Sequence, residues 1–162
     1  MLFGSVDYIF AFLPITLVGY YALNRWHLLC ASKLWLICAS LVFYSWWSVH
    51  NLPIIILSIG VNYVVGRRLI AAKTGGRAVL IGGLAFNLGL LGYYKYLAFA
   101  VENINYAIGT DFAILDIKLP LAISFFTLQQ IAYLVDAHEG LVPRGNALDY
   151  VLFVCFFPQL II

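Results

Sequence analysis

The chain has 162 residues, of which 64% are hydrophobic and only 10% are charged. Soluble domains contain about 45–50% apolar and about 25% charged residues, so this composition excludes an ordinary soluble globule and indicates an integral membrane protein. The net charge of +2 is too small to favour nucleic acid as a partner, and no aromatic–basic platform of the kind that binds single strands is present. We therefore expect a lipid bilayer around the chain and no bound nucleic acid.

The apolar runs predict an all-α, polytopic helix bundle. A membrane helix needs about 20 mostly apolar residues, and this rule gives five to six segments in one multi-span membrane domain. They lie near residues 5–24, 31–49, 52–70, 79–101, 119–136 and 147–162, the last of them incomplete. A signal peptide carries positive charge before its apolar core, whereas the first basic residue here, Arg25, follows the first run. We therefore expect an uncleaved first helix.

Two prolines carry local predictions. The second and third segments are separated only by the short stretch SVHNL, which predicts a helical hairpin with Pro53 in the first turn of the next helix. Pro158 lies inside the last apolar run and predicts a kinked or interrupted helix there.

The loops alternate in charge, and this sets the expected orientation. Loop 25–33 carries Arg25 and Lys33, and loop 67–77 carries four basic residues and no acid. Loop 102–118 carries three acids against one lysine. The positive-inside rule then places loops 25–33 and 67–77 in the cytoplasm, and the N-terminus and loop 102–118 outside. We expect a multi-pass protein with an extracytoplasmic N-terminus.

The fifth segment contains a polar arc. At about 100° per residue in a helix, Gln129, Gln130, Tyr133 and Asp136 fall within about 120° of one another. Unpaired polar groups in hydrocarbon cost several kcal/mol, so the arc must face other helices or a water-filled cavity. Two readings stay open: the arc holds helices together through hydrogen bonds, at about 0.6 kcal/mol each, or it lines a substrate path. Asp136 is expected at the membrane interface.

Two other segments carry features that favour helix packing. Asn62 shares a helix face with Ser58 and Gly66 at four-residue spacing. In the fourth segment, a stripe of small residues at three- and four-residue spacing predicts the close approach of a neighbouring backbone. The stripe consists of Gly82, Ala85, Gly89 and Gly92.

Motifs alone assign no chemistry to the chain. His27, His50 and His138 are predicted in loops, without the spacing of metal ligands or of a nucleophile–base pair. No GxSxG, GxGxxG or P-loop motif occurs. No metal site is predicted.

Several stretches in the same order resemble the membrane-bound O-acyltransferases. They are ICASLVFYSWWSV, VNYVVGRRL, LGYYKYLAFAVENIN and, most specifically, LPLAISFFTLQQIAYLVDAHEG followed by FFPQLI. The last resembles the alginate O-acetyltransferase branch, which reads LPxxISF-aromatic-TFQxxxYxxDxYRG and then FPQLIAGP. Gln129, Tyr133 and Asp136 match this pattern residue by residue. Ala122 stands where many members have Gly, Leu128 stands where they have Phe, and His138-Glu139 replaces Tyr-Arg.

The resemblance implies an enzyme. Family members have about ten or more membrane helices around a tunnel, which the acyl donor enters from the cytoplasmic side and the acceptor hydroxyl from the other. An intramembrane histidine in the C-terminal part acts as general base, which suits a dry tunnel because water is kept from the activated acyl group. That histidine is expected beyond Ile162, so no catalytic residue is assigned here. We expect the chain to be the N-terminal part of such a protein and to be inactive alone.

The resemblance also implies substrates and partners. We expect transfer of an acetyl or similar small acyl group to an extracytoplasmic polysaccharide, either alginate-like exopolysaccharide or peptidoglycan, at a bacterial inner membrane. The acyl donor, acetyl-CoA or another activated acyl group, is a substrate, and no bound cofactor is expected. A periplasmic acyl-handling protein is the expected partner. The sequence leaves the donor, the acceptor and the oligomeric state open.

Two other functions stay open on the sequence. A transporter or channel component also suits broken helices and polar groups at mid-membrane, although no inverted repeat relates residues 1–80 to residues 81–162. The second open function is that of a small membrane adaptor without catalytic activity.

Overall fold

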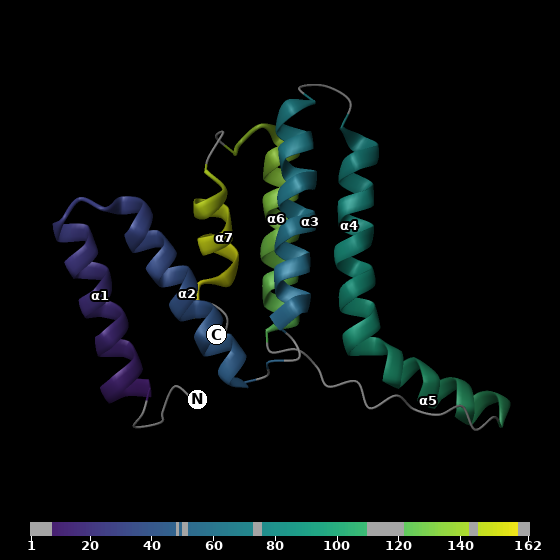
Figure 1. Ribbon diagram of the computed structural model, residues 1–162. Coiled ribbons are helices and arrows are strands. Elements are labelled where there is room, and N and C mark those ends of the chain that lie inside the picture. Colours follow the sequence, from purple (N-terminus) through teal and green to yellow (C-terminus); the bar gives the residue numbers. More distant parts are fainter. Residues whose placement is uncertain are drawn as a thin grey trace. The chain divides into compact units, whose positions relative to one another are not determined.

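The computed structural model describes residues 8–47, 49, 52–72, 76–109, 122–142 and 146–158, and within these ranges the chain is helical, with no strand (Figure 1). The elements in chain order are the π-helical turn η1 (Tyr8–Phe12), α1 (Leu13–Arg25), α2 (Leu29–Trp47), α3 (Leu52–Ala71), α4 (Arg77–Leu91), the π-helical turn η3 (Gly92–Tyr96), α5 (Leu97–Ile108), α6 (Ile123–Glu139) and α7 (Ala147–Cys155). The predicted all-α class is confirmed.

Every predicted membrane segment contains a helix, but fewer helices than expected are long and apolar enough to cross a membrane. Three qualify among the described residues: Leu29–Trp46, Leu52–Ala71 and Arg77–Tyr96. The predicted count of five to six is therefore too high by this criterion. Helices α1, α6 and α7 have 13, 17 and 9 residues and end at turns that apolar composition does not reveal.

The structure agrees with both proline predictions. Pro53 lies in the first turn of α3, as predicted. Helix α7 ends at Cys155, and Pro158 lies in the turn beyond it, so the predicted interruption is also confirmed. The Phe157 amide in this turn donates a hydrogen bond to Ser40 Oγ, at 3.2 Å. Ser48, His50 and Asn51 of the predicted hairpin connection lie outside the described residues.

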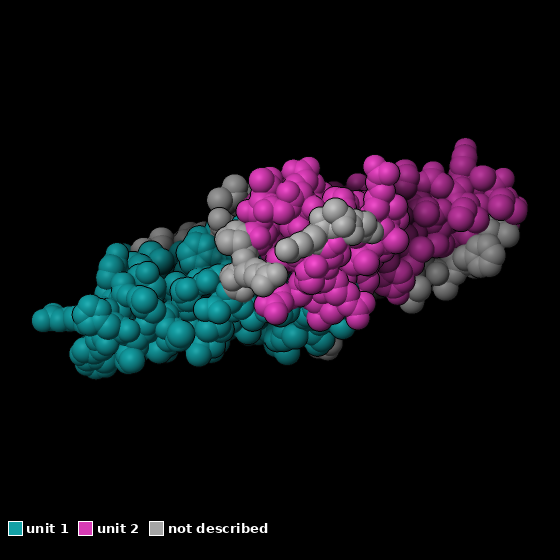
Figure 2. Space-filling view, turned by 90° about the horizontal axis from the view of Figure 1, so that it is seen from above, with its two compact units in different colours: residues 1–63, 143–162 teal, residues 64–142 magenta. Residues whose placement is uncertain are grey.

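The chain divides into two compact units (Figure 2). The first comprises residues 1–63 and 143–162, and the second comprises residues 64–142. Helix α3 contributes to both. Whether the whole chain forms one membrane domain stays a prediction.

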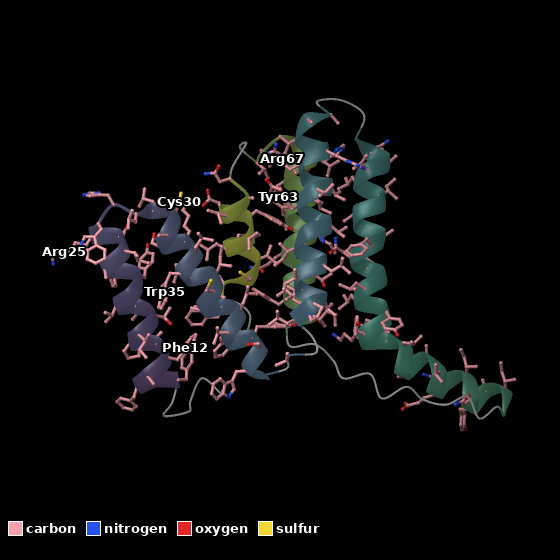
Figure 3. All side chains as sticks on the ribbon, viewed as in Figure 1. Phe12, Arg25, Cys30, Trp35, Tyr63 and Arg67 are labelled. Atoms are coloured by element: carbon pink, nitrogen blue, oxygen red, sulfur yellow. The ribbon has the colours of Figure 1, made fainter. Side chains whose placement is uncertain are left out.

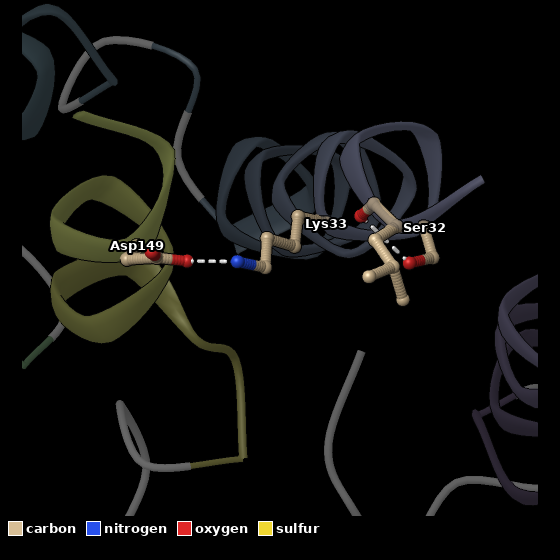
Figure 4. Close-up of polar contacts among 4 residues, drawn as sticks. Ser32, Lys33 and Asp149 are labelled. Carbon is tan, nitrogen blue, oxygen red and sulfur yellow. Dashed lines mark hydrogen bonds and ion pairs between the residues drawn. The ribbon is translucent and has the colours of Figure 1, made fainter. Parts of the chain in front are cut away.

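The first unit joins the beginning of the chain to its last described helix. The Trp35 indole of α2 donates a hydrogen bond to the Thr16 carbonyl of α1 at 3.0 Å, and Trp35 also packs against Gly19 (Figure 3). Lys33 of α2 forms an ion pair with Asp149 in the first turn of α7 (Figure 4). Lys33 thus lies within helix α2, not in the predicted loop.

An aromatic cluster forms the core of this unit. It contains Tyr8, Phe12, Phe43 and Phe157, with Leu13 packed against it. The ring centroids of Tyr8 and Phe43 lie 5.5 Å apart, and those of Phe12 and Phe157 lie 5.4 Å apart. Such offset and edge-on ring pairs add about 0.5–1.5 kcal/mol beyond area burial.

The second unit contains α4, η3, α5, α6 and the C-terminal part of α3. Helix α4 runs antiparallel to α6, and α3 runs parallel to α6 (Figure 1). Leu69, Leu134 and Ala137 form its buried apolar cluster.

The fourth predicted segment, 79–101, is wrong at its C-terminal end. The straight part of the helix ends with η3 at Tyr96, and α5 then turns away from the axis of α4 (Figure 1). Tyr96 has φ −113° and ψ −10°, away from regular helical values. Counting apolar residues misses such a turn because α5 is itself rich in apolar residues.

Candidate functional site

Helix α6, which carries the predicted polar arc, has defined ends. Ala122 precedes its first residue in the left-handed conformation, with φ 56° and ψ 21°. At the other end Gly140 also has positive φ, 77°, and the Leu141 amide donates a hydrogen bond to the Asp136 carbonyl at 2.9 Å. This closure is the usual glycine C-cap. Leu128, Gln129 and Tyr133, which occupy the positions of the family's FQxxxY pattern, thus lie on one uninterrupted helix.

The structure separates the four residues of the arc. Gln130 is fully buried, Gln129 and Tyr133 are half-buried, and Asp136 is exposed. The buried face of α6 consists of Ile123, Phe126, Thr127, Gln130, Leu134 and Ala137. This face is rotated from the predicted arc, so that Thr127, which the arc left out, is buried and Asp136 is not. The interfacial position of Asp136 stays a prediction.

Two glycines let the helices of this unit come close together. A Cβ at Gly66 of α3 would overlap the Tyr133 ring of α6. A Cβ at Gly83 of α4 would lie 2.7 Å from Leu134 Cδ1 and 2.9 Å from Val65 Cγ1. Close packing at small residues is the usual way in which membrane helices associate. The predicted packing role of Gly66 is confirmed.

One helical turn from this contact lies a layer of buried amides. Gly83 faces Leu134 across the antiparallel pair, so Asn87 of α4 and Gln130 of α6, each four residues further towards the same end, lie at the same level. Both are fully buried. Asn87 Nδ2 also donates a hydrogen bond to the Gly83 carbonyl, at 2.8 Å. Buried amides at the same level of a bundle can form hydrogen bonds with each other or with a polar ligand.

Thr127 adds a hydroxyl one turn further along α6. It is fully buried, and Thr127 Oγ1 makes no hydrogen bond to any residue that the structure describes. A buried hydroxyl without a partner costs about 1–3 kcal/mol. Thr127 and Asn87 were not predicted. Asn87 had one available signal, because it is the only amide in the apolar sequence of α4, RAVLIGGLAFNLGLL.

Asn62 behaves as a packing residue within the first unit. Asn62 and Ser58 are fully buried. Asn62 Nδ2 donates to the Ser58 carbonyl of its own helix at 2.9 Å and lies 3.5 Å from Ser58 Oγ.

The predicted small-residue stripe of the fourth segment is wrong as a close contact. No described atom lies within 4 Å of a Cβ placed at Gly82, Gly89 or Gly92. The close approach occurs instead at Gly83, one residue away and on another face of α4. A stripe identifies which residues are small, but not which face meets the neighbour.

The titratable residues lie away from the amide layer. His27 and His138 are exposed, and His50 lies outside the described residues. Lys95 is exposed, with its Nζ 5.5 Å from the Tyr96 ring centroid. In the described ranges no group of three or more His, Cys, Asp or Glu could hold a metal ion. The buried face of α6 therefore offers uncharged donors and acceptors, which can position a polar group but cannot act as an acid or base at neutral pH.

Comparisons with known proteins identify relatives over almost the whole chain. The chain is 40% identical to a Helicobacter pylori protein named "Peptidoglycan O-acetyltransferase", with 99% of this chain and 36% of the relative covered. It is 37% identical to a Pseudomonas aeruginosa protein named "Probable alginate O-acetylase AlgI", with 99% and 32% covered. An Azotobacter vinelandii protein of the same name is 34% identical, with 99% and 33% covered.

The chain thus spans about one third of the length of these curated relatives. No family model matches the chain, and no solved structure matches it.

Proposed function

We propose that this chain belongs to the membrane-bound O-acyltransferase family and forms part of a membrane O-acetyltransferase that acts on an extracytoplasmic polysaccharide. The observation that carries the proposal is the identity of 34–40% to named O-acetylating enzymes over 99% of the chain. Three described helices long and apolar enough to cross a membrane suit such an enzyme. The relatives give no support to a transporter, a channel component or a non-catalytic adaptor.

The acceptor is either peptidoglycan or an alginate-like exopolysaccharide. The names of the relatives favour these two polymers and no other. Both are hydroxyl-bearing polymers outside the cytoplasmic membrane, so the reaction passes an acyl group from an activated donor, acetyl-CoA or another such compound, to a sugar hydroxyl.

Within this enzyme, we assign different roles to the residues of the arc. Gln130 is fully buried between packed helices and stabilises the bundle together with Asn87. Gln129, Tyr133 and Asp136 are half-buried or exposed, and they line the substrate tunnel. A fully buried side chain in a packed layer leaves no room for a substrate, whereas a half-buried amide can donate to an acyl oxygen.

The general base of the reaction lies outside the residues described. His27 and His138 are exposed, and neither lies on the buried face of α6. A histidine of the kind expected from the family resemblance fills this role.

The protein lies in the bacterial inner membrane with its N-terminus outside. The support for this orientation is the charge of the loops, since loop 67–77 is basic and loop 102–118 is acidic. This places the first residues of α6 towards the extracytoplasmic acceptor. A periplasmic acyl-handling protein takes part at that side.

The test is O-acetylation in the source bacterium. Deletion of the gene is expected to remove ester-bound acetate from peptidoglycan or from exopolysaccharide, measured as acetate released by mild base from each purified polymer. Complementation with the gene is expected to restore it. Unchanged ester content in both polymers after deletion would contradict the proposal.

A further inference from the structure

Helix α5 begins at Leu97, directly after a helical span that is long enough to cross a bilayer. The span Arg77–Tyr96 has 20 residues, which extend about 30 Å at about 1.5 Å per residue, the thickness of the hydrocarbon core. One end carries Arg77 and the other carries Tyr93, Tyr94, Lys95 and Tyr96. Aromatic residues gather in this way at the interface between membrane and water.

The backbone changes direction at this point. The π-helical turn η3 covers Gly92–Tyr96, and Tyr96 departs from helical geometry with φ −113° and ψ −10°. Such π-helical insertions are a known cause of helix kinks. Figure 1 shows α5 running across the axis of α4 instead of continuing along it. A helix that starts at the bilayer surface and turns in this way runs along that surface.

The sequence of α5 divides it into two faces. At about 100° per residue, Leu97, Val101, Ile104 and Ile108 fall within about 60° of one another. The opposite side carries Phe99, Glu102, Asn103 and Tyr106. One side thus carries one charged residue, Glu102, the polar residues Asn103 and Tyr106 and one aromatic residue, Phe99, whereas the other side is aliphatic. An aliphatic face opposite a more polar one is typical of an amphipathic interfacial helix.

The C-terminal half of the aliphatic face is open in the structure, whereas Leu97 and Val101 are half-buried. Ile104 is 43% exposed and Ile108 is 70% exposed. Among the described elements, α5 packs against η3 alone. Asn103, on the polar side, donates to the Phe99 carbonyl of the same helix at 2.7 Å and needs no partner elsewhere.

We propose that α5 is an interfacial helix that lies in the plane of the membrane surface, with its aliphatic face in the outer part of the acyl chains. The molecule that covers this aliphatic face is phospholipid, because the helix is continuous with a membrane span and begins at an aromatic belt. Residues 97–109 contain one acid and no basic residue, so binding depends on apolar burial and not on attraction to anionic headgroups. This inference goes beyond acyl transfer and does not depend on it.

Depth measurements on spin-labelled variants of the full chain test the proposal. Single cysteines at Ile104, Ile108, Glu102 and Asn103 are labelled in a background with Cys30→Ser, Cys38→Ser and Cys155→Ala. Each variant is reconstituted in phosphatidylcholine vesicles, and collision rates with oxygen and with a water-soluble nickel chelate are measured. A label at Leu88, which is 57% exposed near the middle of the span, gives the mid-membrane reference. Circular dichroism and thermal unfolding against the unlabelled chain show that each variant is folded.

The labels at Ile104 and Ile108 are expected about 5–10 Å below the headgroups, and those at Glu102 and Asn103 in water. Adding phosphatidylglycerol is expected to leave these depths unchanged. The proposal is overturned if all four labels are in water, if all four are as deep as Leu88, or if Ile104 and Ile108 are shielded from both reagents. The last result would indicate a protein partner or a second copy on this face.

Discussion

The cores of the two units hold helices together by different means, although the first unit also contains a ring-to-glycine contact, Trp35 against Gly19, and a buried amide, Asn62. The first unit packs large aromatic rings, with Tyr8, Phe43 and Phe157 buried against one another. The second unit packs at glycines, where Gly66 meets Tyr133 and Gly83 meets Leu134, and it buries amides next to these contacts. The rings fill the space between helices, whereas the glycines allow the helices to come closer together.

This difference indicates where polar groups can act. Backbones that come close at glycines bring side chains such as Asn87 and Gln130 within reach of a neighbouring helix. A ring cluster offers no comparable donors or acceptors. We therefore place the chemistry of the chain in the second unit, and we regard the first as a scaffold that joins the chain's start to its last described helix. Substitutions in each unit test this division, beginning with the one that lowers stability most.

Removing one ring from the first unit is expected to have the largest effect on stability. Phe157 is 3% exposed and contacts Tyr8, Phe12 and Phe43. Phe157→Ala leaves a cavity among rings and is expected to lower the free energy of unfolding by about 3 kcal/mol. Unfolding by dodecyl sulfate in mixed micelles measures it. The control is Phe153→Ala on α7, where the side chain is 44% exposed. Equal losses in both variants would show that the cluster is not a core.

Enlarging a contact glycine is expected to damage the second unit. In Gly66→Val the new side chain meets the stiff Tyr133 ring, and the free energy of unfolding is expected to fall by about 2 kcal/mol. Gly60→Val is the matched control on the same helix, because nothing lies within 4 Å of a Cβ at Gly60. The same micelle titration compares them. If Gly60→Val proves the more harmful, helix propensity and not packing determines the effect.

Relieving backbone strain at the start of α6 is expected to stabilise the chain. Ala122 has φ 56°, a conformation that costs a residue with a Cβ about 1 kcal/mol. Ala122→Gly is expected to raise the free energy of unfolding by about this amount. Ala132→Gly, in the middle of the same helix, is expected to lower it by about 1 kcal/mol. Thermal unfolding should therefore shift in opposite directions, and a loss of stability in Ala122→Gly would contradict the geometry.

Replacing one buried amide is expected to have the smallest effect. Gln130→Leu replaces a fully buried amide, and a hydrogen bond between membrane helices is worth about 0.6 kcal/mol. A double-mutant cycle with Asn87→Leu measures whether the two amides are coupled. The account predicts a coupling energy of about 0.5 kcal/mol or more, as for residues in contact. Strict additivity would place the two side chains in separate environments.

The sequence predicted the location of the helices better than their faces. Hydrophobic runs are long and unambiguous, and each predicted segment contains a helix. The end of the fourth segment was wrong because Leu97, Val101 and Ile104 extend the apolar run past the turn at Tyr96. Composition records how apolar a stretch is, but not where its axis bends.

The candidate site was predicted in part. The arc of α6 was a sound indication of unusual polarity, but its buried side depends on where α3 and α4 lie, which no single sequence states. Thr127 was therefore left out, and Asn87 was overlooked beside a stripe of glycines. The departure at Ala122 from the family's glycine was noted, but the positive φ at this position was not predicted from it.

Whether Gln129 lines the substrate tunnel is decided by the acetyl-transfer rate of Gln129→Leu, per folded molecule, in membranes of the source bacterium that contain the gene product. We expect a rate about tenfold lower, equivalent to about 1.4 kcal/mol in the transition state, at unchanged stability. Gln130→Leu is expected to keep the rate and lose stability, and Leu128→Met, at a 60% exposed neighbour, to change neither. A Gln129→Leu variant with the full rate, or a Gln130→Leu variant that is stable but slow, would contradict the division of roles on α6.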